Sequence, residues 1–490
     1  MSNAHDRQAL RPSPPDSAAS STPLPARYRR TRPAWVVVTV LVFVEIISAF
    51  ETSMMYAAMP TLIVEFDTDA ATAGWAVTSF LLVAAASAAV CGRLGDMYGR
   101  ERVLVVVLAA AAIGSLVSAL GDSLGAIIAG RTIQGAAGAI LPLCIGLARE
   151  HLPASRVPVA VSLVSGSAVA AGAASLLVAG ALIDHASWHM IFVVTAIYAF
   201  GALALVVFVL PWRPRPDGPG GHTRERIDHL GAVTLAAAVA AILLGVNKAQ
   251  SWGWTDARVA ALVVGGLAAL GLLVVRELRI PNPIVNLRLF AQRKFAITMI
   301  ATVAISAGPL GIVTMIIPLV LQTSDPDGFG LGLSPTHAGW ISFLGALVGF
   351  ACTPLSGRIS GATGARTAML LGSALFAVST VMLLVGHDSL AVMSAMIVVG
   401  SIATAFAYTA LPNLVVEAVP QENTSEATGT NTVVRTVGQG VGTSVATMML
   451  AHAATSGAGT TSGLVAVGVL VLALTVVTIA LVIAIPRRTT

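Results

Sequence analysis

The sequence predicts an all-α polytopic membrane protein, and three observations support this fold class. The chain has 490 residues, of which 56% are hydrophobic and only 10% are charged, whereas soluble proteins carry about 25% charged residues. Apolar runs long enough to cross a bilayer recur along the chain. A glycine-rich polar segment lies between two such runs at 92–104, and a weaker copy lies at 357–366. Such a repeat indicates a chain built from two duplicated halves.

The expected elements begin with a tail at residues 1–33. This segment is rich in Ser, Pro and Arg and has no apolar period, which predicts a disordered cytoplasmic tail. A first six-helix bundle (34–210) follows, with spans at about 35–62, 73–91, 103–120, 124–148, 158–182 and 189–210. A cytoplasmic linker at 211–229 is rich in Pro, Gly and Arg, a composition that favours a loop.

Eight more spans follow the linker, which brings the total to about fourteen. The two polar segments are separated by eight spans rather than six, so two extra helices lie between two six-helix bundles. The extra pair occupies 230–276, with spans at about 230–249 and 257–275, and a cytoplasmic loop at 277–294 follows. The second bundle occupies 295–486, with spans at about 295–322, 336–356, 366–386, 389–416, 428–451 and 463–485. Residues 487–490 are the expected cytoplasmic end.

The charge of the loops orients these spans. Basic loops alternate with acidic or neutral loops almost throughout, and basic loops stay on the cytoplasmic side, so we expect both termini in the cytoplasm. Two loops break the alternation. Lys248 and Arg258 are basic residues in a loop that we expect on the outer side of the membrane. The loop 420–426 is acidic, although we expect it on the cytoplasmic side.

The composition also argues against several classes of function. The net charge is only +5, and the basic residues lie in loops. This distribution indicates orientation in the membrane rather than nucleic-acid binding. The three cysteines lie in or beside apolar runs, and no metal-ligand spacing is present. No phosphate-binding loop and no nucleophile–base motif occurs. We therefore expect no enzyme, no metal, no cofactor and no ATP-driven transport.

The polar segment at 92–104 is expected to be a tight cytoplasmic turn between two spans. Gly92 and Gly99 let the helix ends approach closely, and Asp96 can cap a helix or hold an arginine. The copy at 357–366 repeats both glycines at the same spacing, but Gly361 stands where the first copy has Asp96. An ordinary basic loop is the simpler alternative, and the existence of the copy argues against it.

This repeat resembles the signature loop of the major facilitator superfamily, whose acidic residue and arginines latch the two halves together. The resemblance implies that Asp96 and Arg100 form a conformational latch, with Arg93 as a further candidate. The fourteen-helix architecture is similar to the drug:proton antiporter branch of that family, of EmrB/QacA type. The segment 281–290 resembles the usual entry of that branch to its second bundle.

Two acids lie in the first span, Glu45 and Glu51. A carboxylate in the bilayer core costs about 2.5–3.5 kcal/mol on insertion scales, so we treat both as functional candidates. The stretch 51–60 resembles the helix-one motif of the fourteen-helix branch, with Glu51 in place of Asp. The resemblance implies proton coupling or cation recognition by Glu51, and a structural hydrogen-bonded acid is the alternative. Glu45 lies about 120° round the helix from Glu51 and is a candidate for the substrate cavity.

The adaptable side chains of Met54 and Met55 replace smaller residues of the same motif and are further candidates for the cavity wall. In the fourth span, the run from Arg131 to Ala139 resembles the helix-four motif of the superfamily, which implies a proton-relay role for Arg131 with Gln134 beside it. An arginine that extends toward the membrane interface is the alternative.

Three further features concern the fifth, ninth and thirteenth spans. Drug antiporters, which the chain resembles, usually carry a proline kink in the fifth span. Here residues 166–180 contain no proline, although their small side chains permit close helix packing. In the ninth, Gly308-Pro309 predicts a local break of the helix. In the thirteenth, polar residues recur at every fourth position, and either a cavity-lining or a packing role fits them; they are Asn431, Arg435 and Gln439. We place Asn431 and Arg435 at the substrate cavity.

These observations predict a secondary active transporter of a bacterial plasma membrane. It is expected to act as a monomer and to export amphiphilic or hydrophobic compounds, including drugs and antibiotics, by proton antiport. Its partners would be a small amphiphilic substrate, protons and the lipid bilayer. Export of an endogenous lipid or secondary metabolite, symport, and a receptor that binds without transport remain alternatives.

Overall fold

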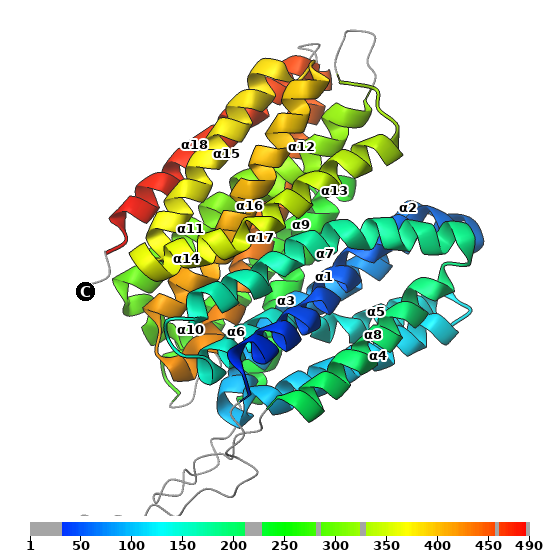
Figure 1. Cartoon of the computed structure of the whole chain (residues 1–490). Coiled ribbons are helices and arrows are strands. Elements are labelled where there is room, and N and C mark those ends of the chain that lie inside the picture. Colours follow the sequence, from blue (N-terminus) through cyan, green and yellow to red (C-terminus); the bar gives the residue numbers. More distant parts are fainter. Residues whose placement is uncertain (1–31, 211–227, 281–285, 324–329, 456–459, 487–490) are drawn as a thin grey trace, which may run out of the picture.

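The computed structural model describes residues 32–210, 228–280, 286–323, 330–455 and 460–486, and the regular elements in these ranges are helices (Figure 1). The all-α fold class is therefore confirmed. The expected tail at 1–33 and the linker at 211–229 lie almost entirely outside the described residues.

The first bundle contains six membrane-crossing segments. The chain enters it at Ala34, because Pro33 cannot continue a helix toward the N-terminus. α5, η2 and α6 together form its fourth segment. The elements are α1 (Ala34–Glu65), α2 (Ala70–Ala73), α3 (Trp75–Tyr98), α4 (Arg100–Leu120), α5 (Leu124–Gln134), η2 (Gly135–Ala139), α6 (Ile140–His151), α7 (Val157–His185) and α8 (His189–Val209).

The extra pair and the second bundle follow in the expected order. The pair is α9 (His229–Trp252) and α10 (Ala257–Glu277). The second bundle contains η3 (Leu287–Ala291), α11 (Arg293–Ile305), η4 (Ser306–Leu310), α12 (Gly311–Gln322), α13 (Pro335–Ala351), α14 (Thr353–Thr363), α15 (Ala365–Gly386), α16 (Leu390–Ala418), η5 (Gln421–Asn423), α17 (Thr424–Thr455) and α18 (Thr460–Ala484).

Twelve helical segments of the described residues are long and apolar enough to cross a membrane. α9 and α17 are also long helices, but the apolar part of α9 is only Leu230–Val246, and α17 carries many hydroxyl and charged side chains. The sequence predicted about fourteen spans, whereas twelve helices of the described residues have the length and apolarity of a span, and α9 and α17 account for the difference.

The predicted break at Gly308-Pro309 is confirmed. Gly308 has non-helical dihedrals, φ −96° and ψ −111°, between α11 and α12. Proline removes a backbone donor and clashes with the preceding turn, so the helix cannot continue regularly. The glycines of α17 pack against this break, because a Cβ at Gly442 would lie 2.0 Å from the carbonyl oxygen of Ala307.

The polar segment at 92–104 contains a tight turn between two helices, as the sequence predicted, and the turn is shorter than the segment. α3 continues to Tyr98 and α4 begins at Arg100, so Gly99 alone makes the turn, with φ +102°. Its copy behaves in the same way, with α14 ending at Thr363 and Gly364 turning at φ +93°. A single residue with positive φ suffices for the turn, and the polar residues around it extend the helices instead.

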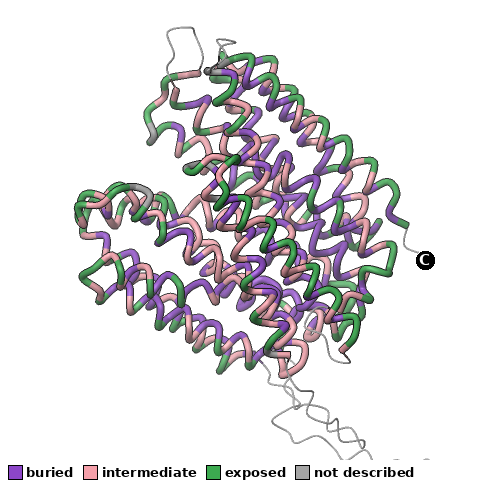
Figure 2. Tube along the Cα trace, turned by 180° about the vertical axis from the view of Figure 1, so that it is seen from behind, coloured by how far each residue is buried: buried purple, intermediate pink, exposed green. Residues whose placement is uncertain are grey.

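The two bundles converge at the end that holds the α3–α4 turn and diverge toward the end that holds α2 (Figures 1 and 2). The first residues of α1 lie at the converging end (Figure 1). Buried residues lie in the interior of each bundle and where the bundles meet, whereas exposed residues follow the outer helix faces (Figure 2). This arrangement sets the position of each candidate site below.

Candidate functional site

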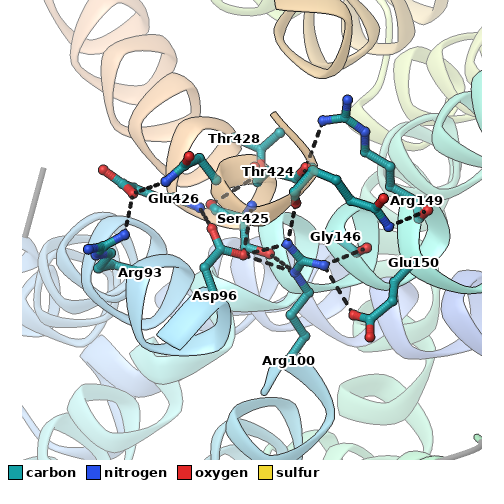
Figure 3. Close-up of polar contacts among 12 residues, drawn as sticks. Arg93, Asp96, Arg100, Gly146, Arg149, Glu150, Thr424, Ser425, Glu426 and Thr428 are labelled. Atoms are coloured by element: carbon teal, nitrogen blue, oxygen red, sulfur yellow. Dashed lines mark hydrogen bonds and ion pairs between the residues drawn. The ribbon is translucent and has the colours of Figure 1, made fainter. Parts of the chain in front are cut away.

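Asp96 joins the first bundle to the second at the converging end (Figure 3). Its Oδ2 accepts a hydrogen bond from the backbone N–H of Glu426 at 2.8 Å, and its Oδ1 accepts one from Ser425 N–H at 3.3 Å. Both donors belong to the first turn of α17, where backbone N–H groups lack intrahelical partners. The helix dipole also favours a negative charge at this position. Asp96 therefore caps a helix of the opposite bundle.

Arg100 connects the same elements through its guanidinium group (Figure 3). Its Nε donates to Asp96 Oδ1 at 2.9 Å and to Ser425 Oγ at 2.9 Å. Its Nη2 donates to the carbonyl oxygen of Gln421 at 2.6 Å, and its Nη1 forms an ion pair with Glu150 at 3.1 Å. Arg100 is 6% exposed, so one buried cation holds groups from both bundles.

Two more arginines extend this interface. Arg93 Nη1 lies 3.1 Å from Glu426 Oε2. Arg149 Nη1 donates to Val419 O at 2.8 Å and to Thr424 Oγ1 at 2.9 Å. Close approach of α3 and α17 requires a glycine, because a Cβ at Gly92 would lie 2.5 Å from a backbone oxygen of the second bundle.

The predicted latch residues Gly92, Arg93, Asp96, Gly99 and Arg100 thus lie together. Sequence reasoning missed their partners, among them Ser425, Glu426, Gln421, Arg149 and Glu150. The signal was present as the acidic loop 420–426, which broke the alternation of loop charge. This acidic loop supplies the negative charge opposite the basic turn of α3 and α4.

The second exception to loop charge also has an explanation. Lys248 Nζ lies 5.2 Å from the centre of the Trp75 ring, and the Arg258 guanidinium lies 5.6 Å from the centre of the Trp252 ring. Cation–π contacts of this kind stabilise basic side chains. Both contacts occur at the end of the molecule opposite the latch.

A second polar cluster lies inside the first bundle. Arg131 Nη1 donates to Gln134 Oε1 at 3.0 Å, and Gln134 Nε2 donates to Ser115 Oγ at 2.6 Å. Ser115 Oγ lies 3.4 Å from Glu51 Oε1. All four residues are fully buried, at 0% exposure. Ser115 Oγ also lies 2.8 Å from the carbonyl oxygen of Ala111, so its one hydrogen is shared between Ala111 and Glu51. The three predicted proton-coupling residues therefore lie in one cluster around Ser115, a link that sequence reasoning missed.

Glycines bring the helices of this cluster together. A Cβ at Gly114 of α4 would lie 2.6 Å from the carbonyl oxygen of Gly130 in α5. This close approach places Ser115 within reach of Gln134. Arg131 is held further by the carbonyl oxygen of Ala76, at 3.1 Å from its Nε.

Two polar atoms of this cluster form no hydrogen bond with the described residues. Glu51 Oε2 and Arg131 Nη2 have no hydrogen-bond partner there. The guanidinium carbon of Arg131 lies 4.1 Å from the centre of the Phe80 ring, and Phe80 also lines the central cavity. A carboxyl group in this position can take up or release a proton, and the ring links its cationic neighbour to the cavity wall.

A central cavity of about 430 Å³ lies between the bundles. Helices α1, α3, α6 and α7 of the first bundle and α16 and α17 of the second contribute to its walls. Glu45 and Arg435 line it, as expected from the sequence, and so does Gln439. The cavity also exposes Ser and Thr hydroxyl groups and many Ala side chains.

The other predicted cavity residues, Met54, Met55 and Asn431, do not line this cavity. Met54 and Met55 are fully buried and pack in a cluster with Trp188 and Phe192. Thr52 and Ser53 line the cavity just before them on α1, whereas Met54 and Met55 turn into the interior of the first bundle. Asn431 Nδ2 donates to Thr302 Oγ1 of α11 at 2.8 Å. Asn431 therefore packs two helices of the second bundle together.

No group of three or more His, Cys, Asp or Glu side chains in the described part of the chain could hold a metal ion. The acids discussed above are instead distributed over the latch, the Glu51 cluster and the cavity.

Comparison with known proteins gives the following similarities. A family model described as Major Facilitator Superfamily matches residues 41–330 and 299–489. The tetracenomycin C resistance and export protein of Streptomyces glaucescens is 28% identical over 267 residues, which cover 54% of this chain and 48% of that protein. The multidrug efflux pump LfrA of Mycolicibacterium smegmatis is 27% identical over 418 residues, covering 84% and 80%.

The chain thus spans about half the length of the first of these relatives. Among solved structures, the human organic anion transporter MFSD10 (TETRAN) aligns with a TM-score of 0.64 at 15% identity, covering 92% of this chain and 100% of that one. At this identity the likeness concerns the fold alone.

Proposed function

The chain belongs to the major facilitator superfamily, and on that premise we propose that it exports hydrophobic or amphiphilic compounds, drugs and antibiotics included, by proton antiport. Two relatives are named as exporters of an antibiotic and of multiple drugs, which supports this substrate class. The inserted pair α9 and α10 supports assignment to the fourteen-helix branch of EmrB/QacA type. We further propose a monomer in a bacterial plasma membrane with both termini in the cytoplasm.

The observation that carries the proton-coupling part is the buried chain from Glu51 through Ser115 and Gln134 to Arg131. An ionised carboxylate without enough partners is unstable in an apolar interior. Glu51 should therefore keep its charge only while Arg131 is oriented toward it. Protonation of Glu51 removes this attraction from Arg131, whose guanidinium already lies over the ring of Phe80, a residue that lines the cavity. A change in the position of Arg131 would therefore act on the cavity wall through this ring.

The latch supplies the conformational part of the proposal. It joins the bundles at the end where α1 begins, so with the termini in the cytoplasm this structure is closed on the cytoplasmic side. Opening that side requires separation of Asp96 from the first turn of α17. Protonation of Glu51 would bias this equilibrium by changing the relative stability of the two states. One proton moving through 100 mV supplies about 2.3 kcal/mol, enough for a roughly fiftyfold concentration gradient.

The test is proton release when substrate binds. Purified protein in weak buffer is mixed with a panel of lipophilic cations and neutral drugs while pH is recorded. We expect release from the native chain and none from Glu51→Gln, since the amide carries no exchangeable acid proton. Glu277→Gln is the matched control, because Glu277 is also buried, at 4% exposure, but belongs to the inserted pair. Undiminished release from Glu51→Gln would refute the proposal.

A second candidate is export of an endogenous lipid or secondary metabolite, or symport. α7 favours it, because this helix continues from Val157 to His185 without the proline at 166–180 that drug antiporters usually carry. Uptake into inverted vesicles with and without an imposed pH gradient separates the candidates. Antiport predicts accumulation that depends on an acidic interior, whereas symport predicts loss of substrate from such vesicles.

A further inference from the structure

We propose that the central cavity selects dipolar substrates, which place an acidic group at Arg435 and a hydrogen-bond donor or ammonium group at Glu45. This inference rests on the proposed transport function and specifies its substrate class. It concerns the charge pattern of the ligand, and it does not depend on whether protons drive the transport.

The first support is the placement of the two charges. Glu45 belongs to α1 of the first bundle and Arg435 to α17 of the second, and both line the cavity. They are 2% and 8% exposed, respectively. Glu45 Oε2 and Arg435 Nη1 have no hydrogen-bond partner among the described residues, and no ion pair joins the two side chains there. Both groups are therefore held out of bulk water with hydrogen-bonding capacity left for a ligand, and the charge of Arg435 favours the ionised form of Glu45.

The neutral groups in the wall add a directional preference. Several threonine hydroxyl groups donate their hydrogen to a carbonyl oxygen one helical turn earlier, so their oxygens remain as acceptors; these are Thr52, Thr404, Thr432 and Thr436. Tyr408 Oη accepts from Gln439 Nε2 at 3.2 Å. Ligand donors thus find many partners, whereas a ligand acid finds one cationic partner, the guanidinium of Arg435, among the described lining residues.

Desolvation energy then decides between ligand classes. A monocation bound at Glu45 would enclose Arg435 with no counter-charge, and a monoanion bound at Arg435 would do the same to Glu45. A buried charge that loses its partner costs several kcal/mol. A dipolar ligand compensates both charges at once. It also touches both bundles, so its binding favours one relative position of the bundles over others.

The body of the ligand should be aromatic or otherwise rigid and apolar. Phe80 and Tyr408 line the cavity together with many small apolar side chains, and the Tyr408 ring lies 4.5 Å from the Arg435 guanidinium carbon. The volume of about 430 Å³ lies in the range of drug-sized sites.

A fluoroquinolone series tests the charge pattern on one scaffold. The parent compound carries a carboxylate and a piperazinium group, its methyl ester is a cation, and its N-acetyl derivative is an anion. Equilibrium dialysis with the purified full-length chain measures binding of each. We expect the zwitterion to bind at least about tenfold more tightly than either derivative. Arg435→Gln should remove its advantage over the cation, and Glu45→Gln its advantage over the anion.

Conservative and exchanged variants keep the test decisive. Arg435→Lys and Glu45→Asp should retain the preference, and so should the double exchange Glu45→Arg with Arg435→Glu, because both charges remain. Equal affinities for the three compounds, a preference that no variant changes, or no detectable zwitterion binding would overturn the inference. A preserved binding preference without export driven by a pH gradient would refute the antiport proposal and leave this inference standing.

Discussion

The two copies of the glycine turn have the same backbone but opposite chemistry. Gly99 and Gly364 both turn with positive φ between consecutive helices. At the first turn, Asp96 accepts hydrogen bonds from the start of α17. At the second, Gly361 occupies the equivalent position and faces Pro158 in the first turn of α7, where a Cβ would lie 3.7 Å from the proline ring. Proline has no N–H to donate. The second turn therefore lacks both the carboxylate acceptor that Asp96 supplies at the first turn and the backbone donor that it would bind.

The charges near the second turn serve their own bundle instead. Glu417 accepts from the Ala365 N–H at 2.9 Å and from Lys294 Nζ at 2.7 Å, all within the second bundle. Neutral groups join that side to α7, because Asn413 Nδ2 donates to Ser162 Oγ at 3.1 Å and to Pro158 O at 3.3 Å. One interface is held by charged groups, and the other by neutral hydrogen bonds and close packing. We infer that the charged interface opens during transport, because separated charges regain hydration.

The largest effect on this comparison is expected from Arg100→Ala. This substitution leaves the carboxylates of Glu150 and Asp96 without the buried guanidinium of Arg100. The free energy that holds this interface closed should fall by about 3–5 kcal/mol. Double electron–electron resonance between spin labels on α6 and α16 should report a shift toward separated bundles. Arg358→Ala is the control, because Arg358 is an exposed arginine near the second turn and is equivalent to Arg93, whereas Ala365 stands at the position of Arg100. An unchanged distance distribution in Arg100→Ala would show that charge does not hold this interface.

Close packing should matter equally on both sides. A Cβ would meet backbone atoms at 2.5 Å from Gly92 and at 2.7 Å from Gly357. We expect Gly92→Ala and Gly357→Ala each to cost about 1–3 kcal/mol through overpacking, measured as a loss of thermal stability in detergent. Gly361→Ala has room for the methyl group and serves as the control. A stable Gly357→Ala variant would contradict the packing role of the second interface.

A moderate effect is expected from Asp96→Asn. The amide can still accept a hydrogen bond from α17, but it loses the charge that interacts with Arg100 and the helix dipole. We expect a cost of about 0.5–2 kcal/mol, visible as partial opening in the same spin-label experiment. Asp96→Ala should open the interface further. Equal behaviour of the two variants would mean that the hydrogen bonds contribute nothing beyond the charge.

The smallest effect should come from restoring the missing chemistry at the second turn. Gly361→Asp alone should change stability by less than about 0.5 kcal/mol, because Pro158 offers no N–H. Combined with Pro158→Ser, it should show a favourable coupling of about 0.5–2 kcal/mol in a double-mutant cycle. The cycle is read from thermal unfolding. Additive effects would mean that the two turns differ by more than this one donor–acceptor pair.

The sequence by itself determined the helical membrane fold, the repeat and the helix break. Apolar runs specify spans because the bilayer leaves unpaired backbone groups no water to bind. Proline causes the break at Gly308-Pro309 because it lacks a backbone N–H, and glycine permits the turns because it adopts positive φ. Both effects are local and can be predicted from the sequence. Glu51, Arg131 and Gln134 could be singled out because a charged or polar residue within an apolar run is conspicuous.

Only the tertiary structure decided which side chains meet. Asp96 contacts Ser425, which is more than three hundred residues away in the sequence. Nothing in the sequence distinguishes Ser115 from other serines, and only the packing of α4 against α5 brings it to Gln134. For the same reason, the sequence did not show that Met54 and Met55 pack with Trp188 and Phe192. Helical periodicity specifies which residues share a face, but not which neighbouring helix that face contacts. That choice depends on how small residues such as Gly92 and Gly114 let particular helices approach.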